Sequence, residues 1–180
     1  TEEGLDISMA LQFYGRFKFF HELLPLVQKA KDAGEDAKMM TILAAAKGST
    51  TDFEDLDVKN KYSLRKSSAH VSTFNDVMVK VFAERHPDIT FIHVYPGVVD
   101  TPVMRINWWM SMLMDVAKPF MRKPKVAGQI LLYPLLNPKF DGGAYYLNEY
   151  ANKLSLNNTF TDDFTRKVWQ HALQMAQVQE

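Results

Sequence analysis

The chain has 180 residues, of which 47% are apolar and 23% charged, a composition typical of a single domain with a sizeable core. Its 21 basic and 21 acidic residues give a net charge of zero, so no long-range field attracts nucleic acid or an anionic membrane. The absence of cysteine excludes disulfides, thiolate catalysis and zinc-thiolate sites.

Two helix–strand units are expected in the first half of the chain. The helical period of the apolar residues predicts a helix over residues 5–31, and residues 38–44 are typical of a short buried strand. A polar loop over 47–61 separates them from a second helix, residues 67–86, which ends at a proline. Residues 89–95 are rich in β-branched and aromatic side chains and are flanked by prolines, which predicts a second buried strand.

The second half is expected to contain three helices and one strand, in the order helix, helix, strand, helix. Residues 105–124 are dense in Met and Trp and show no strand period. Residues 125–136 are expected to be helical, and residues 144–147 to form a third strand after a Gly pair. Thr159 or Thr161 can cap a final helix, because two aspartates follow that suit its positive end.

The alternation of helices and strands predicts an α/β fold with a parallel sheet, right-handed crossovers and helices on both faces. About three strands are few for this much helix. Either further strands come from sequence that is not present, or an open sheet edge is covered by a partner or by a second copy of the chain. We expect residues 1–180 to form a single domain that is the carboxyl-terminal part of a longer one.

The start of the chain bears on its location. No apolar run reaches the roughly 18 residues that a transmembrane helix needs, so no transmembrane segment is expected. The opening TEEGLD lacks the basic and apolar regions of a signal peptide, and Thr1 is not an initiator methionine. We therefore expect a cytoplasmic protein with missing sequence upstream.

Four segments carry a resemblance to a known family. In order, they are TEEGLDISMALQFYGRFKFFHELLPL, KMMTILAAAKG, ITFIHVYPGVVDTP with its P-G-x-V-x-T pattern, and GGAYYLNEY followed by TDDFTRKVWQHA. Together they resemble the short-chain dehydrogenase/reductase superfamily, in particular its retinol-dehydrogenase-like branch, over essentially the whole chain. The resemblance implies an incomplete Rossmann-like three-layer sandwich with about three strands and an NAD or NADP cofactor.

The resemblance places the cofactor beside Pro96, Gly97, Val99 and Thr101. Ligands of open α/β sheets bind outside the carboxyl ends of the strands, which agrees with this position. Pro96-Gly97 allows the backbone to approach closely, and the Val99 backbone and the Thr101 hydroxyl are suited to hydrogen-bond a carboxamide or phosphate. The alternative is a plain turn in which Thr101 caps a following helix.

The family's chemistry also needs a tyrosine whose pKa a lysine lowers, with a serine and an asparagine beside it. Tyr62 and Lys66 have the four-residue spacing that puts two side chains on one helix face, so they are the catalytic candidates. If the register of the family is held, its Tyr, Lys, Ser and Asn positions fall instead on Ser68, Ser72, Ala44 and Gln12. The family's Gly-rich G-x-x-x-G-x-G turn is also absent.

Other polar and apolar clusters have simpler interpretations. The histidines lack the spacing of metal ligands, so no metal site is expected, and His93 is expected to be a hydrogen-bonded interior residue. The acidic loop over 52–57 is expected to be solvated rather than to bind calcium. The Met- and Trp-rich residues of 108–121 fit a mobile lid over a lipophilic substrate or partner, core packing, or an interfacial membrane anchor.

Two functional hypotheses follow. In the first, the chain is an NAD(P)-dependent oxidoreductase that acts on a carbonyl or alcohol substrate, with Tyr62 and Lys66 as a displaced proton-transfer pair. In the second, it is a catalytically degenerate Rossmann-like module that binds a partner through its open sheet edge or its Met/Trp segment. The sequence identifies neither the substrate nor the choice between NAD and NADP.

Overall fold

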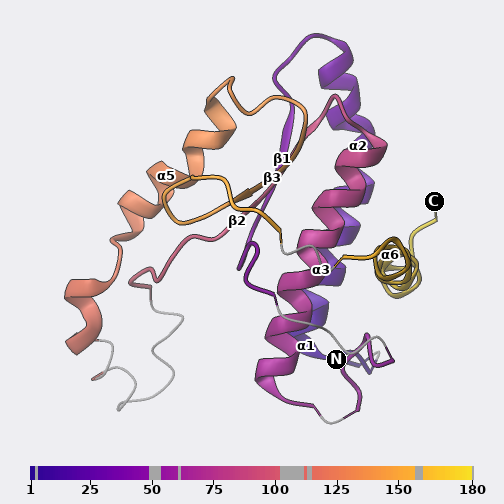
Figure 1. The fold of residues 1–180 in the computed structure, drawn as a ribbon, viewed down its shortest axis with the longest axis horizontal. Coiled ribbons are helices and arrows are strands. Elements are labelled where there is room, and N and C mark those ends of the chain that lie inside the picture. The colour runs from indigo at the N-terminus through magenta and orange to yellow at the C-terminus, as the bar shows by residue number, and fades with distance from the viewer. Residues whose placement is uncertain are drawn as a thin grey trace.

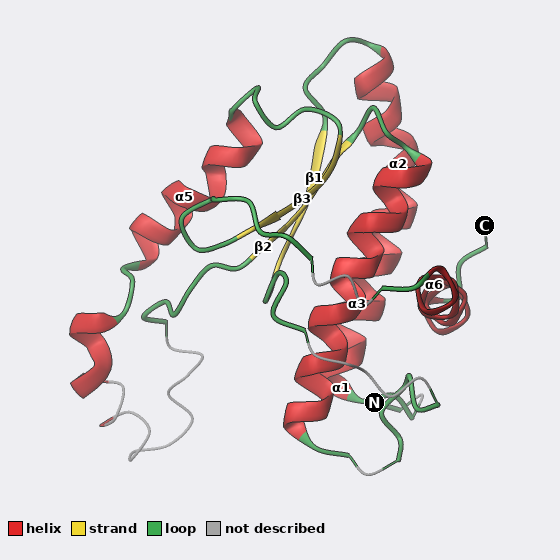
Figure 2. Ribbon diagram, viewed as in Figure 1, coloured by secondary structure: helices red, strands yellow, loops and turns green. Residues whose placement is uncertain are grey.

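The computed structural model describes residues 1–2, 4–48, 54–60, 62–101, 112, 115–156 and 160–179. These residues form a three-stranded parallel sheet with helices on both faces (Figures 1 and 2). In chain order the elements are α1 (Ile7–Met9), a π-helical segment (Ala10–Tyr14), α2 (Gly15–Asp32), β1 (Lys38–Ile42), α3 (Leu64–Arg85), β2 (Thr90–Val94), a 3-10 turn (Lys118–Phe120), α5 (Pro124–Leu136), β3 (Gly143–Leu147) and α6 (Asp162–Ala176). The expected α/β fold is confirmed.

The first helix is continuous from α1 through the π-helical segment to α2. Asp6 caps it by accepting a hydrogen bond from the Met9 N–H at 2.8 Å. One face is buried, as the spacing of its apolar residues predicts, and this face carries Met9, Phe13, Phe17 and Phe20. Phe17 packs edge-on against Trp169 of α6, with ring centroids 5.0 Å apart, so the last helix closes over the first.

The central helix α3 is the most deeply buried element. Every residue from Val71 to Val79 is buried, because α3 contacts the sheet on one side and the first and last helices on the other. It begins earlier than predicted, at Leu64, because Ser63 is extended and its hydroxyl accepts a hydrogen bond from the Lys66 N–H at 3.1 Å. This earlier start decides where the predicted catalytic residues lie.

Two separate apolar clusters fix the three layers of the fold. On one face of the sheet, Phe91 of β2 belongs to the large cluster that α2, α3 and α6 share. On the other face, Ile92 and Val94 pack with Leu147 of β3 and Leu131 of α5. Side chains of a strand alternate between its faces, so both faces of β2 are covered, and each of its residues is buried.

The connections between the strands depart from one expectation. The strands are adjacent in chain order, β1-β2-β3, so both crossovers step in the same direction across the sheet. Since α3 covers one face and α5 the other, the two connections have opposite hands (Figure 1). The prediction that both are right-handed is therefore wrong for one of them. Long stretches of sequence, residues 43–63 and 95–123, separate each of these helices from the strand before it, and a long connection weakens the twist coupling on which the rule rests.

The two edges of the sheet differ. Outside β3, the Leu154 N–H donates to the Tyr146 carbonyl at 2.7 Å, so a returning segment covers that edge. At β1, Arg16 donates to the Ile42 carbonyl at 2.7 Å, but no described strand pairs with the outer edge. The predicted partner or second copy at this edge stays a prediction. No described helix combines the length and apolar character needed to cross a bilayer.

Candidate functional site

The loop that leaves β2 forms the core of the candidate site. The Tyr95 N–H still donates to the Leu147 carbonyl of β3 at 2.9 Å, and the chain then turns at Pro96-Gly97. Gly97 has a φ of +78°, and a Cβ there would lie 3.0 Å from the Glu149 Cβ. Only glycine fits such a turn without strain, so the sequence fixes both the end of the strand and its close approach to residue 149.

The same loop leaves the main-chain N–H and C=O of one residue, Val99, free to bind a ligand. Arg122 bridges the loop, since its N–H donates to the Val98 carbonyl at 2.9 Å and its carbonyl accepts from the Asp100 N–H at 3.0 Å. This bridge uses the groups on either side of Val99 but not those of Val99 itself. No described residue forms a hydrogen bond with the Val99 N–H or C=O. Both groups are therefore available to a ligand.

A groove of about 550 Å³ runs along this loop. It is lined by Pro96, Gly97, Val98, Val99 and Thr101 on the loop and by Pro124, Ala127, Gly128 and Leu131 on α5. A Cβ added to Gly128 would meet nothing within 4 Å, so the helix leaves space on this side. A flat apolar ring fits such walls, and a carboxamide attached to it can bond the free Val99 groups. The predicted cofactor residues thus lie together at the carboxyl end of β2.

The alternative role of Thr101, as the cap of a following helix, concerns residues 102–111, which lie outside the described residues. So do Trp108, Trp109 and Met110 of the Met/Trp segment. The described members Met112, Val116 and Phe120 are exposed, and Phe120 is 92% exposed. These three side chains are therefore not part of the core of the described structure.

The predicted pair Tyr62 and Lys66 lies at the start of α3. Tyr62 precedes the cap residue and is half exposed, and partial burial together with the Asp6 carboxylate raises the pKa of its phenol. The Lys66 ammonium contacts the buried Asp55 carboxylate and donates to the Asn60 carbonyl at 3.0 Å. Lys66 thus holds the preceding loop in place, and the shift of the Tyr62 pKa is opposite to the one that proton donation requires.

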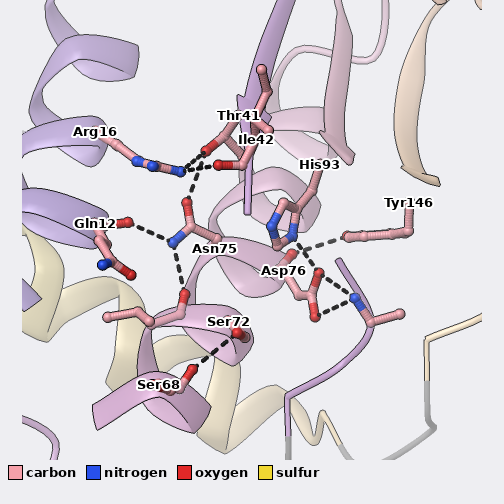
Figure 3. Close-up of polar contacts among 12 residues, drawn as sticks. Gln12, Arg16, Thr41, Ile42, Ser68, Ser72, Asn75, Asp76, His93 and Tyr146 are labelled. Atoms are coloured by element: carbon pink, nitrogen blue, oxygen red, sulfur yellow. Dashed lines mark hydrogen bonds and ion pairs between the residues drawn. The ribbon is translucent and has the colours of Figure 1, made fainter. Parts of the chain in front are cut away.

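The four positions given by the family register do not form a polar cluster. Ser72 is buried, and its hydroxyl donates to the main-chain carbonyl of the exposed Ser68 at 2.9 Å. Gln12 contributes its main-chain carbonyl, which accepts a hydrogen bond from the Asn75 amide at 2.9 Å, and Ala44 has no polar side chain (Figure 3). None of these side chains supplies an acid comparable to a phenol.

A buried group of polar contacts between α3 and the strands involves Asp76, a residue that was not predicted from the sequence. This residue of α3 is 1% exposed, and its carboxylate accepts hydrogen bonds from the His93 ring at 2.6 Å and from the Ala46 N–H at 3.1 and 3.2 Å (Figure 3). Its main-chain carbonyl accepts from the Tyr146 hydroxyl at 3.0 Å. The expectation that His93 is a hydrogen-bonded interior residue is confirmed. The one signal in the sequence was an aspartate in the middle of a predicted helix, between apolar residues such as Phe74 and Val77.

Asp76 also holds the loop that follows β1. Ala46 has a φ of +56°, a left-handed conformation that costs a non-glycine residue about 1 kcal/mol. The two hydrogen bonds from its N–H to the carboxylate offset that cost. Two residues later Gly48 passes so close to α3 that a Cβ would lie 2.1 Å from the Thr73 hydroxyl. The ends of β1 and β2 are therefore held against the same helix.

Metal binding has no support among the described residues, since no group of three or more His, Asp or Glu side chains there can hold an ion. This statement covers the acidic loop only at residues 54–60. The aspartates of that loop instead pair with lysines, Asp55 with Lys66 of α3 and Asp57 with Lys59. Lys59, for example, contacts Asp57 at 2.6 Å.

We expect Asp76→Asn to lower the free energy of unfolding by about 2–4 kcal/mol, because the amide nitrogen that replaces one carboxylate oxygen is a donor facing the Ala46 N–H, and both buried donors are left without that acceptor. Urea denaturation at neutral pH measures this change. The matched control is Asp163→Asn, an exposed acid on α6 that pairs with Arg166 and Lys167, and it should leave the denaturation midpoint unchanged. An Asp76→Asn midpoint equal to that of the unmodified protein would show that the carboxylate does not hold the strands.

Comparisons with known proteins reach beyond the geometry. No family model matches the chain. An oxidoreductase of Emericella nidulans is 33% identical over 103 residues, which cover 57% of this chain and 30% of that protein. The polyprenol dehydrogenase of Mus musculus is 25% identical over 186 residues, covering 97% of this chain and 55% of the relative. A short-chain dehydrogenase/reductase of Stachybotrys chartarum is 25% identical over 214 residues, covering 96% and 59%. The chain thus spans less than two thirds of the length of each of these relatives.

Proposed function

We propose, from the relationship of this chain to the short-chain dehydrogenase/reductase superfamily, that it is part of an NAD(P)-dependent oxidoreductase. The proposed substrate is a carbonyl or alcohol compound. The observation that carries the proposal is the groove at the carboxyl end of β2. It combines apolar walls for a flat ring with the unpaired main-chain N–H and C=O of Val99, which can bond the carboxamide of that ring. Open α/β sheets bind their ligands at this rim.

Each residue of the loop has a separate role in this proposal. Pro96 and Gly97 bring the backbone close to the ring, the Val99 N–H and C=O bond the carboxamide, and the Thr101 hydroxyl reaches a phosphate or the same carboxamide. When bound, the nicotinamide supplies the carbon that gives or takes the hydride. The chain's own contribution is to hold that ring in one orientation and to exclude water from its apolar side.

The substrate is proposed to be lipophilic. The chain between the loop and α5 carries exposed apolar side chains at Met112, Val116 and Phe120, which suit contact with an apolar molecule. One relative is named for a polyprenol, an apolar alcohol. Both observations favour a substrate with a sizeable apolar part.

Filling the groove should abolish cofactor binding. In Gly128→Leu, the new side chain occupies space that is open at this position, so the helix should remain intact while the ring is excluded. Titration of the unmodified chain with NADH and with NADPH, followed by nicotinamide fluorescence, should show saturable binding, and the variant should lose it by at least about tenfold in affinity.

The control for this experiment is Gln129→Leu, which adds the same side chain to the next, exposed residue of α5 and should bind like the unmodified chain. The proposal fails if the unmodified chain shows no fluorescence change with either nucleotide at millimolar concentration. It also fails if Gly128→Leu binds both nucleotides unchanged.

The proton donor is the second part of the proposal. Tyr62 is the proposed donor, with Lys66 beside it, and Lys66 must leave Asp55 before it can approach the phenol. If Tyr62 donates the proton, Tyr62→Phe should lower NADPH-dependent reduction of benzaldehyde by about 10²-fold or more. The control is Tyr133→Phe on α5, outside the groove, which should retain full turnover. Undiminished turnover of Tyr62→Phe, or no turnover by an unmodified chain that binds NADPH, rejects this assignment.

A further inference from the structure

A second cavity shares Gly97 and Val98 with the cofactor groove but has a different lining. Its volume is about 320 Å³, and its charged and aromatic residues are Lys47, Tyr95, Arg122, Glu149 and Tyr150, with Phe120 and Met121 completing the wall. Where the groove along α5 is apolar, this cavity has two cations and one carboxylate. Because the two linings share Gly97 and Val98, a molecule bound in the cavity adjoins a ring bound in the groove.

Lys47 stands in this cavity because of the loop that Asp76 holds. The turn at Ala46 directs the next residue toward the end of β2, where the Lys47 ammonium lies 3.4 Å from the centroid of the Tyr95 ring. Over the parts of the chain that the structure describes, no carboxylate forms an ion pair with it. A cation held on an aromatic face keeps its hydrogen-bond donors free for a ligand.

Arg122 supplies the second positive charge. Its guanidinium lies 4.8 Å from the centroid of the Tyr150 ring, and one of its nitrogens donates to the main-chain carbonyls of Glu149 and, at 3.5 Å, of Pro96. These carbonyls fix the orientation of the guanidinium but leave its charge uncompensated. The remaining N–H donors of the Arg122 guanidinium are suited to bind a carboxylate.

The charge balance selects the ligand. Two cations against the single carboxylate of Glu149 leave a net positive charge, so a cationic ligand would be repelled. A neutral ring would have to displace Lys47 or Arg122 from the tyrosine faces that they already occupy. An anionic oxygen group meets both cations without displacing either. The exposed Phe120 at the wall suits an apolar body attached to that group.

We propose that this cavity binds a carboxylate on the substrate, so that the substrate is a carbonyl or alcohol compound that also carries a carboxylic acid. The inference rests on the proposed function only in taking the ligand to be the substrate. Lys47 and Arg122 bind the carboxylate, and the apolar body extends past Phe120.

The test uses two probes of nearly the same shape, 4-formylbenzoate and its methyl ester, with no nucleotide present. Each is titrated into the ¹⁵N-labelled chain, and the amide resonances of Tyr95, Gly97 and Val98 are followed. The acid should bind about tenfold more tightly than the ester and shift these three resonances. In Lys47→Met the ratio of the affinities for acid and ester should fall to about one, whereas Lys47→Arg should keep most of the preference for the acid.

The control is Lys125→Met, an exposed lysine of α5 outside the cavity, which should keep the full preference. Equal affinities for acid and ester overturn the inference, and so does an equal loss of both in Lys47→Met. Shifts confined to resonances outside the cavity overturn it as well. This outcome can be distinguished from that of the proposed function. If the chain binds NADH but does not prefer the acid, only the carboxylate cavity is rejected. If it prefers the acid but does not bind NADH, only the cofactor groove is rejected.

Discussion

The carboxylate of Asp76 is buried between α3 and the carboxyl ends of the strands, and it is the contact on which the rest of the site depends. It accepts hydrogen bonds from His93 on β2 and from Ala46 after β1, while its main-chain carbonyl accepts one from Tyr146 on β3. A buried charge is tolerated only when it is fully hydrogen-bonded, so these partners have little freedom to move. One helix residue therefore sets the relative positions of all three strand ends.

The geometry of the rim follows from that constraint. The left-handed turn at Ala46 puts Lys47 over Tyr95. The glycine turn after Tyr95 leads to Val99, whose main-chain N–H and C=O are unpaired among the described residues. Gly97 and Val98 then line both an apolar groove and a charged cavity. In our proposal a cofactor ring and an acidic substrate occupy these two adjoining sites, although the pair at the start of α3, Tyr62 and Lys66, is engaged with Asp6 and Asp55 instead.

Much of the fold was predictable from the sequence because its helices and strands obey simple periods. The buried face from Met9 to Phe20 and the run of β-branched residues in β2 are local patterns, and local patterns need no knowledge of distant partners. The Pro96-Gly97 turn was predictable for the same reason. Asp76 and Arg122 were not, because their roles depend on residues far away in sequence, such as His93 and Glu149. The hand of the crossovers likewise depends on which face each helix covers, which no local pattern records.

The central claim is that the main-chain N–H and C=O of Val99, which the Arg122 bridge leaves unpaired, bind the carboxamide of a nicotinamide. The most direct measurement is the ¹⁵N–¹H resonance of the Val99 amide during titration with NADH, with AMP as the matched nucleotide that lacks the nicotinamide. Our account predicts that NADH moves this resonance progressively to saturation and that AMP leaves it in place. A Val99 resonance that stays fixed while NADH shifts other amides would contradict the account.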